Sequence, residues 1–330
     1  GRTGKQAGST DGVGPACFLR RHFMSSAREC EPYHALSAAT VVPWRRKKDM
    51  ETPHKREGPP LPQGELSGLP GFYIPSETLR VIEDFLFSGF HVMLTGHSGC
   101  GKTTFGQVWA ASRGMAVHKV NCGAIRSPRD WFGRHEFREG TGTVFVSTRF
   151  LEMLERPGLI ILDEINRTAP ENHNPILNLL DDNREVYVEE LGRHVRVHPE
   201  VLFIATRNAG RHHTGTFRLD HALEDRFQEI RLELPPEEVI ARLLAEKYAI
   251  SAEQAEIVAR VTVKLDRMYE EDLLSQTTGM RPAFAAAALL GRGHSLETAL
   301  RYAFATRYSG EGGPESERTL VLQTIQGLVK

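Results

Sequence analysis

The sequence predicts an α/β fold in which a parallel β-sheet carries helices on both faces, followed by a small all-helical region. From about residue 70 onward, short apolar runs of strand length alternate with stretches whose apolar residues recur at helical spacing. After Pro235-Pro236 the strand-like runs stop and only helical periods continue. We therefore expect a disordered basic tail over 1–65, an α/β core over 66–235 and a helical C-terminal region over 236–330.

Composition limits the classes of protein to which the chain can belong. Its 330 residues are 40% hydrophobic and 25% charged, with a net charge of −1, which gives no overall reason to expect nucleic acid or an acidic membrane as a partner. No apolar run approaches the roughly 20 residues that span a bilayer, so we expect no membrane span. Four cysteines without a C-x-x-C pair indicate neither a disulfide framework nor a zinc site. They fit a reducing compartment, and we expect a cytoplasmic protein.

The first 60 residues differ from the rest in charge and pattern. They hold eleven Lys and Arg against six Asp and Glu, a net of +5, which leaves −6 for the remainder. The segment is rich in Gly, Pro and Ser and shows no strand or helix period, which favours a solvated tail. The cluster Arg45–Lys48 leaves a nucleic-acid or anion patch as the alternative.

The elements expected in the core follow in order along the chain. Ser76 is a candidate N-cap for a first helix, with apolar residues at helical spacing behind it. The continuously apolar strands are typical of a buried parallel sheet. Alternating residues around Leu191-Gly192 predict a β-hairpin. The expected strands are His91–Thr95, Ala116–Asn121, Leu159–Leu162, Val201–Thr206 and Glu229–Leu234, with hairpin arms Glu185–Val188 and His194–Val197. The expected C-terminal helices are Glu237–Tyr248, Ala252–Leu274, Arg281–Leu290 and Ser295–Tyr308.

A glycine-rich loop between the first strand and a helix fits the pattern G-x-x-x-x-G-K-[ST] fully. Its glycines allow a tight turn that aims backbone N–H groups at phosphate oxygens, and the helix adds its positive end. Lys102 is expected to reach the β- and γ-phosphates of ATP, and the Thr103 hydroxyl to bind Mg²⁺. A glycine turn without a ligand is the alternative. We assign nucleotide binding to Gly96, His97, Ser98, Gly99, Cys100, Gly101, Lys102, Thr103 and Thr104. Within the loop, Cys100 is interpreted as a small spacer rather than a redox switch.

The apolar strand Leu159–Leu162 ends in two carboxylates, Asp163 and Glu164. After a complete phosphate loop, these predict a second binding motif, in which Asp163 holds Mg²⁺ through water and Glu164 acts as general base toward the attacking water. Without a phosphate loop in the same chain, two acidic residues at a strand end would be interpreted as a helix cap.

Together with Ala205–Asn208 and the run Leu223–Phe227, these two motifs give the chain a resemblance to the AAA+ ATPases over about residues 70–310. It is closest to the MoxR-type, dynein-related group, whose relatives include the rubisco-activase-like, nitric-oxide-reductase-activating, gas-vesicle and cobalt-chelatase ATPases. The glycine loop and the acidic strand end then match Walker A and Walker B.

The resemblance implies roles for three further residues. Asn208 matches sensor 1, which holds the attacking water or the γ-phosphate; an Asn at a strand end is the alternative. Arg226 matches the arginine finger, which acts on the neighbouring subunit's nucleotide. Arg218 is the alternative finger. A surface salt bridge is the alternative interpretation of Arg226. Arg281 matches sensor 2, although the sequence around it, Gly279–Pro282, differs somewhat from the usual sequence of the family.

The resemblance also implies function and partners. It predicts Mg²⁺-dependent ATP hydrolysis that remodels or activates another protein, carried out by a homo-oligomeric ring, with a hexamer as the natural size. Relatives in this group often work with a partner that carries a von Willebrand factor A domain, so the resemblance makes such a client or adaptor a candidate here. The hairpin at 185–197 and the loop at 133–143 would face the ring pore or the partner, with ordinary surface loops as the alternative.

Two other functions remain open on sequence grounds. One is a nucleic-acid-directed motor, which the negative core and the lack of an aromatic-basic stripe disfavour. The other is a nucleotide-switched assembly module with little turnover, which Glu164, Asn208 and Arg226 disfavour. His97, His212 and His213 have no ligand spacing with nearby Cys or carboxylates and are interpreted as polar loop residues.

Overall fold

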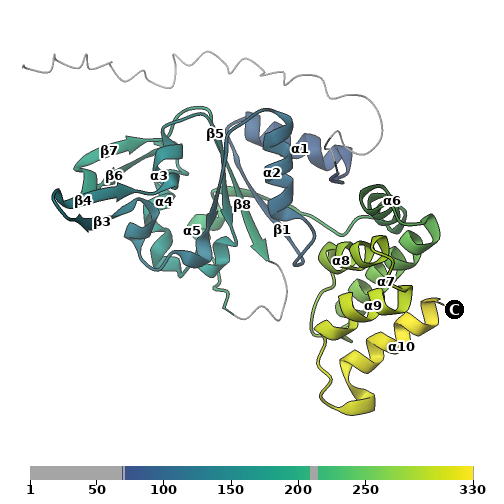
Figure 1. The fold of residues 1–330 in the computed structure, drawn as a ribbon. Coiled ribbons are helices and arrows are strands. Elements are labelled where there is room, and N and C mark those ends of the chain that lie inside the picture. The colour runs from purple at the N-terminus through teal and green to yellow at the C-terminus, as the bar shows by residue number, and fades with distance from the viewer. Residues whose placement is uncertain (1–68, 70, 209–214, 330) are drawn as a thin grey trace, which may run out of the picture. The chain divides into compact units, whose positions relative to one another are not determined.

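The computed structural model describes residues 69, 71–208 and 215–329. The expected tail and the pair His212 and His213 lie outside these residues. The part described begins with a helix and a five-stranded sheet and ends in helices only, which confirms the predicted α/β class with a helical C-terminal region (Figure 1). The boundaries of the three parts stay a prediction.

The main sheet among the described residues has the strand order β2-β5-β8-β1-β9, and every neighbouring pair is parallel. Its strands are β1 (His91–Gly96), β2 (Val117–Asn121), β5 (Gly158–Asp163), β8 (Val201–Asn208) and β9 (Phe227–Arg231). All carboxyl ends therefore lie at one edge of the sheet. Strand β8 separates β5 from β1, so the acidic strand end and the phosphate loop are not on adjacent strands.

The two faces of the sheet belong to two different hydrophobic clusters because successive strand residues point to opposite sides. Leu94 and Ile161 face one way and pack in one cluster with Leu79, Phe105 and Trp109. These last three come from α1 (Ser76–Phe87) and α2 (Lys102–Ser112), which lie against this face (Figure 1).

The opposite face is covered by shorter elements. Met93 and Leu162 pack there with Phe150, Ile176 and Leu223. These three belong to α3 (Arg149–Leu154), α4 (Asn174–Leu177) and α5 (His221–Glu224). Helices on both faces explain why β5 is apolar over five consecutive buried residues.

Two antiparallel hairpins lie outside the main sheet. The predicted one is formed by β6 (Glu185–Val188) and β7 (Arg193–Arg196). The other, β3 (Gly133–Arg138) with β4 (Gly142–Ser147), corrects our expectation of a plain loop over residues 133–143. Charged and polar residues dominate β3, and Phe137 in it is 80% exposed, so the run lacks the inward-facing apolar alternation by which strands are recognised.

The C-terminal region contains only helices among its described residues. They are α6 (Glu237–Tyr248), α7 (Ala252–Glu270), α8 (Met280–Gly291), α9 (Leu296–Ala303) and α10 (Glu317–Val329), and they share one apolar cluster. Helix α7 starts at a capping box in which Ser251 and Gln254 exchange side-chain and backbone hydrogen bonds. None of the described helices has the length and apolar character that crossing a bilayer requires.

Several boundaries differ from the sequence predictions. Helix α1 takes Pro75 as its N-cap and begins at Ser76 itself. Strand β9 begins two residues before the predicted Glu229 and ends at Arg231, because its pairing with β1 fixes the register. Helices α7 and α9 end before the predicted Leu274 and Tyr308, and α10 was not predicted. Such ends depend on packing and capping, which periodicity does not encode.

Candidate functional site

The phosphate loop connects β1 to α2 and uses glycine where other residues would not fit. Gly96 has φ 146°, and a Cβ added there would meet the Leu232 carbonyl oxygen at 2.3 Å. Gly101 has φ 99°, and a Cβ there would meet the Phe72 ring at 2.7 Å. At both positions the positive φ and the closeness of a neighbouring atom exclude a side chain, so only glycine fits.

Lys102, the first residue of α2, is turned back into the loop and is only 6% exposed. Its ammonium donates to the Gly96 carbonyl at 2.9 Å and to the His97 carbonyl at 2.8 Å. Burial lowers the pKa of Lys102, and the nearby Cys100, Asp163 and Glu164 oppose that shift. A partly dehydrated ammonium held at the centre of the loop attracts an anion strongly.

The carboxylate of Asp163 lies beside the start of α2. The Thr103 hydroxyl donates to Asp163 Oδ1 at 2.5 Å, and the Thr206 hydroxyl donates to the same oxygen at 2.8 Å. The ammonium of Lys119 lies 3.6 Å from Oδ2. Hydroxyl and carboxylate oxygens are the ligands that Mg²⁺ prefers, so Thr103 and Asp163 fit the predicted magnesium site.

Glu164 has a backbone conformation that is unusual for a residue with a side chain, with φ 53°. Its N–H donates to the Thr206 hydroxyl at 2.9 Å. Its carboxylate accepts from Asn208 Nδ2 at 3.0 Å and pairs with Arg167 Nε at 3.1 Å. Such backbone strain is common at functional sites. Here one hydrogen bond from the Glu164 N–H and one to its carboxylate hold the residue in this conformation.

These residues line one cavity of about 290 Å³ together with residues of the helical region. Arg281, in the first turn of α8, is exposed and lines the same cavity as Lys102 and Glu164. An apolar and aromatic wall, which the sequence did not indicate, completes it with Phe72, Tyr73, Leu243 and Phe284. The structure thus brings Lys102, Thr103, Thr104, Asp163, Glu164, Asn208 and Arg281 together.

The helical region also holds the first half of the phosphate loop. The Met280 N–H donates to the Gly99 carbonyl at 3.1 Å, and the Thr277 hydroxyl donates to the Ser98 carbonyl at 3.3 Å. Within the loop, Gly96 and His97 do not line the cavity. The thiol of Cys100 is buried, which raises its pKa, and so fits the spacer role rather than a redox switch.

Arg226 does not line the cavity of its own chain. Its guanidinium donates to the Leu177 and Ala222 carbonyls at 3.2 and 2.5 Å and lies 3.4 Å from an Asp181 carboxylate oxygen. The alternative finger, Arg218, is exposed. Neither residue lines the cavity that holds Lys102 and Glu164.

The sequence analysis assigned no role to three residues that contact the two carboxylates: Thr206, Arg167 and Lys119. Thr206 had a signal available, because it lies near the end of β8, the strand that pairs with the acidic strand, with Leu162 opposite Ala205. Using that signal requires the strand order, which one sequence does not give. Arg167 lies three residues after Glu164 in a short 3₁₀ turn, Ile165–Arg167, and its spacing gave no separate signal.

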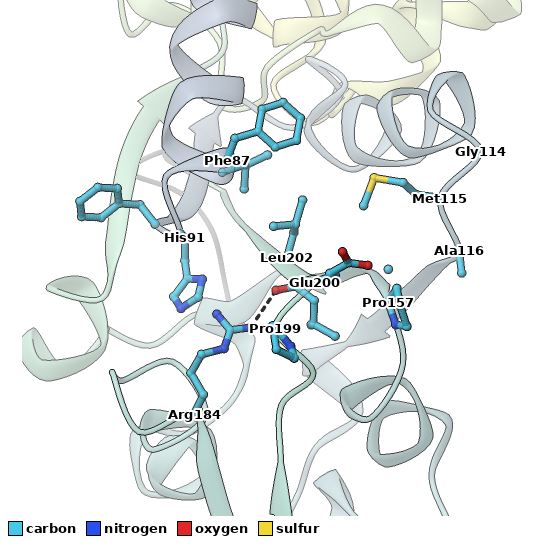
Figure 2. A pocket seen from close by; sticks show the side chains of 15 residues that line it. Phe87, His91, Gly114, Met115, Ala116, Pro157, Arg184, Pro199, Glu200 and Leu202 are labelled. Atoms are coloured by element: carbon cyan, nitrogen blue, oxygen red, sulfur yellow. Dashed lines mark hydrogen bonds between the residues drawn. The ribbon is translucent and has the colours of Figure 1, made fainter. Parts of the chain in front are cut away.

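A second cavity, of about 440 Å³, lies at the opposite edge of the sheet, where β1, β5 and β8 begin (Figure 2). None of the predicted site residues lines it. His91 and Arg184 lie on the same side of it, and Arg184 Nη2 donates to the Val201 carbonyl at 2.8 Å. Burial and, to a smaller extent, the charge of Arg184 lower the pKa of His91 to about 4.

This pKa makes stability depend on pH. The unfolded chain binds a proton at His91 with the ordinary pKa near 6.5, whereas the folded chain binds it only near pH 4. The contribution of neutral His91 to the free energy of unfolding is therefore complete above pH 6.5 and is lost as the pH falls toward 4. Between pH 7 and pH 5 we expect about 2 kcal/mol of unfolding free energy to be lost through His91.

Urea unfolding at the two pH values tests this expectation. His91→Gln should lose about 2 kcal/mol less than the parent chain over the same interval. His294→Gln, at an exposed position, is the control and should behave like the parent. An unchanged pH dependence in His91→Gln would show that His91 is not buried in its neutral form.

Comparisons with known proteins agree with this geometry. Residues 91–227 match the family model described as AAA domain (dynein-related subfamily). The chain is 30% identical over 237 residues to the putative chaperone BssE of Thauera aromatica, covering 70% of this chain and 81% of that protein. It is 26% identical over 242 residues to the denitrification regulatory protein NirQ of Pseudomonas aeruginosa, covering 73% and 92%. It is 24% identical over 233 residues to protein NorQ of Paracoccus denitrificans, covering 70% of this chain and 85% of that protein.

A parallel sheet with a glycine phosphate loop, an acidic strand end and a following helical region defines a P-loop protein of the AAA+ class. Within it, the chain belongs to the MoxR-like AAA+ ATPases, in the dynein-related subfamily of AAA domains. A nucleotide-binding site is inferred from the domain.

Proposed function

We propose that this chain hydrolyses ATP with Mg²⁺ and uses the energy to remodel or activate a partner protein. The observation that carries the proposal is the single cavity that joins Lys102, Asp163, Glu164 and Arg281. A buried ammonium, an oxygen ligand pair and a positioned carboxylate are the parts that phosphoryl transfer to water needs. The aromatic wall of the cavity is suited to the adenine base.

Each side chain then has a specific task. Lys102 exchanges its two loop carbonyls for the β- and γ-phosphate oxygens and so neutralises charge that builds up in the transition state. Thr103 and Asp163 would hold Mg²⁺, which would supply positive charge beside the phosphates. Glu164 accepts a proton from the attacking water, while Asn208 fixes the direction in which the carboxylate points. Arg281, from the helical region, adds a positive charge to the same cavity.

The partner is proposed to be a protein on the basis of likeness to BssE, whose name contains the word chaperone, and to NirQ, which is named a regulatory protein. We propose that the chain works as a ring, with a hexamer as the expected size. The ring is supported by the resemblance to AAA+ ATPases; Arg226 lies outside its own cavity, so as an arginine finger it would reach a nucleotide only across a subunit interface. A client or adaptor with a von Willebrand factor A domain remains part of the proposal.

Glu164→Gln tests the hydrolytic role. The amide cannot accept the proton from water, so turnover should fall on the order of 10²- to 10⁴-fold while ATP still binds. Phosphate release gives the turnover and calorimetry the affinity, each with and without DNA, because stimulation by DNA would favour the nucleic-acid motor. Glu139→Gln, in the exposed turn of the β3–β4 hairpin, is the matched control. Turnover at the parent rate in Glu164→Gln would place the base elsewhere.

A further inference from the structure

A second group of ligand-type side chains lies beside the phosphate loop, outside the nucleotide cavity. His97 of the loop approaches Asp266 and Glu270 of helix α7, and one ligand atom from each lies within 4.8 Å of the others. The three line a separate cavity of about 440 Å³. Asp266 and Glu270 share a face of α7 because residues four apart on a helix are neighbours. Sequence spacing gave no sign of this group, since His97 is far from both acids along the chain.

The carboxylate of Asp266 is not satisfied by the protein. It is 14% exposed, and its Oδ1 is buried without a hydrogen-bond partner among the described residues. The nearest cationic candidate is His97 Nδ1 at 3.7 Å, which is too long for a hydrogen bond. A buried carboxylate oxygen without a donor is costly, so a cation bound at this position would stabilise it.

The donor set identifies the kind of ion that fits. One imidazole nitrogen and two carboxylate oxygens suit Zn²⁺ and similar first-row ions, whereas Mg²⁺ prefers oxygen ligands alone. Bonds of about 2.1 Å in a tetrahedral site put two ligand atoms roughly 3.4 Å apart. The His97 and Asp266 atoms are already near this separation at 3.7 Å, and the exposed side chain of Glu270 can complete it by a rotamer change.

We propose that His97, Asp266 and Glu270 form a binding site for a divalent transition-metal ion of the Zn²⁺ class. The ion joins the phosphate loop to helix α7 of the helical region, in addition to the bonds that Thr277 and Met280 make to the loop. The rings of His97 and Tyr269 pack in a T-shaped arrangement with their centroids 5.3 Å apart, which limits the rotation of the imidazole. Water completes the coordination, because the cavity extends beyond the three ligands.

Zinc titration of the full chain, free of nucleotide and Mg²⁺, tests the proposal by calorimetry. The parent chain should bind one more Zn²⁺ ion than Glu270→Gln, or bind it at least tenfold more tightly. Glu270 is exposed, so this variant is expected to fold normally. Asp266→Asn should show the same loss, with its folding checked by circular dichroism. Glu271→Gln, the adjacent exposed acid outside the group, is the matched control and should bind zinc like the parent.

Thermal unfolding gives an independent readout, because an ion that binds only the folded chain raises the melting temperature. Zinc should raise it in the parent and in Glu271→Gln, and chelation with EDTA should reverse the rise. The shift should be absent or smaller in Glu270→Gln and Asp266→Asn. Identical zinc affinity and identical melting shifts in all four proteins would overturn the proposal, since the zinc would then bind elsewhere. A parent chain that binds no zinc at micromolar concentration would overturn it equally.

Discussion

Arg226→Ala is expected to leave ATP affinity unchanged and to lower hydrolysis by about 10³- to 10⁵-fold, the contribution of arginine fingers in phosphoryl transfer. Affinity is kept because Arg226 does not line the cavity of its own chain. Hydrolysis falls because the neighbouring subunit loses the charge that stabilises its transition state. The variant also loses hydrogen bonds to the Leu177 and Ala222 carbonyls, so a modest drop in melting temperature is expected.

Mixing two inactive variants shows whether the arginine acts across an interface. Arg226→Ala subunits keep an intact Glu164, and Glu164→Gln subunits keep an intact Arg226. In a mixed ring some interfaces therefore pair a complete pocket with a complete finger, and activity should reappear. If Arg226 acts within its own chain, no interface contains a complete site and the mixture stays inactive.

The mixing experiment needs two controls: one for assembly of the two variants into the same ring, and one for the loss of an arginine elsewhere on the surface. Light scattering or native mass spectrometry must show that the two variants form rings together. Arg292→Ala, an exposed arginine at the end of α8, should retain full activity. Absence of recovery in rings that contain both variants would contradict the proposed role of Arg226. The exposed Arg218 would then be tested by the same mixing experiment.

Lys102→Ala is expected to weaken ATP binding on the order of 10²- to 10⁴-fold, because two charge-assisted bonds to phosphate are lost at about 1.5 to 3 kcal/mol each. In the structure the ammonium is already placed inside the loop, bonded to the Gly96 and His97 carbonyls. Alanine removes the positive charge that these two bonds hold inside the loop. The loss of affinity therefore comes from the missing attraction between the ammonium and the phosphates.

Calorimetry with ATP and Mg²⁺ measures this effect directly. Lys264→Ala, at an exposed position of α7, is the matched control and should bind ATP as the parent does. Circular dichroism should show that Lys102→Ala keeps its helix content, because α2 retains its buried residues Phe105 and Trp109. Unchanged ATP affinity in a folded Lys102→Ala chain would mean that Gly96–Thr103 does not hold the phosphates.

Much of the candidate site could be predicted because its motifs are continuous in the chain. The phosphate loop is a run of eight consecutive residues with four positions of defined type, and the acidic strand end needs an apolar run followed at once by Asp163 and Glu164. The strands themselves were predicted well where both faces are covered, since β5 then has to be apolar throughout. Local chemistry fixes these features, so no knowledge of distant neighbours is required.

The sequence by itself therefore determined the fold class, the phosphate loop, the two carboxylates and the change to helices after residue 235. The tertiary structure alone decided that β8 lies between the two motif strands, so that Thr206 contacts Asp163 and Asn208 contacts Glu164. It also decided that His97 turns toward Asp266 of α7 while Lys102 turns back to the loop carbonyls. The physical reason is that strand order and helix packing minimise exposed apolar surface over the whole chain, and residues far apart in sequence become neighbours only through that packing.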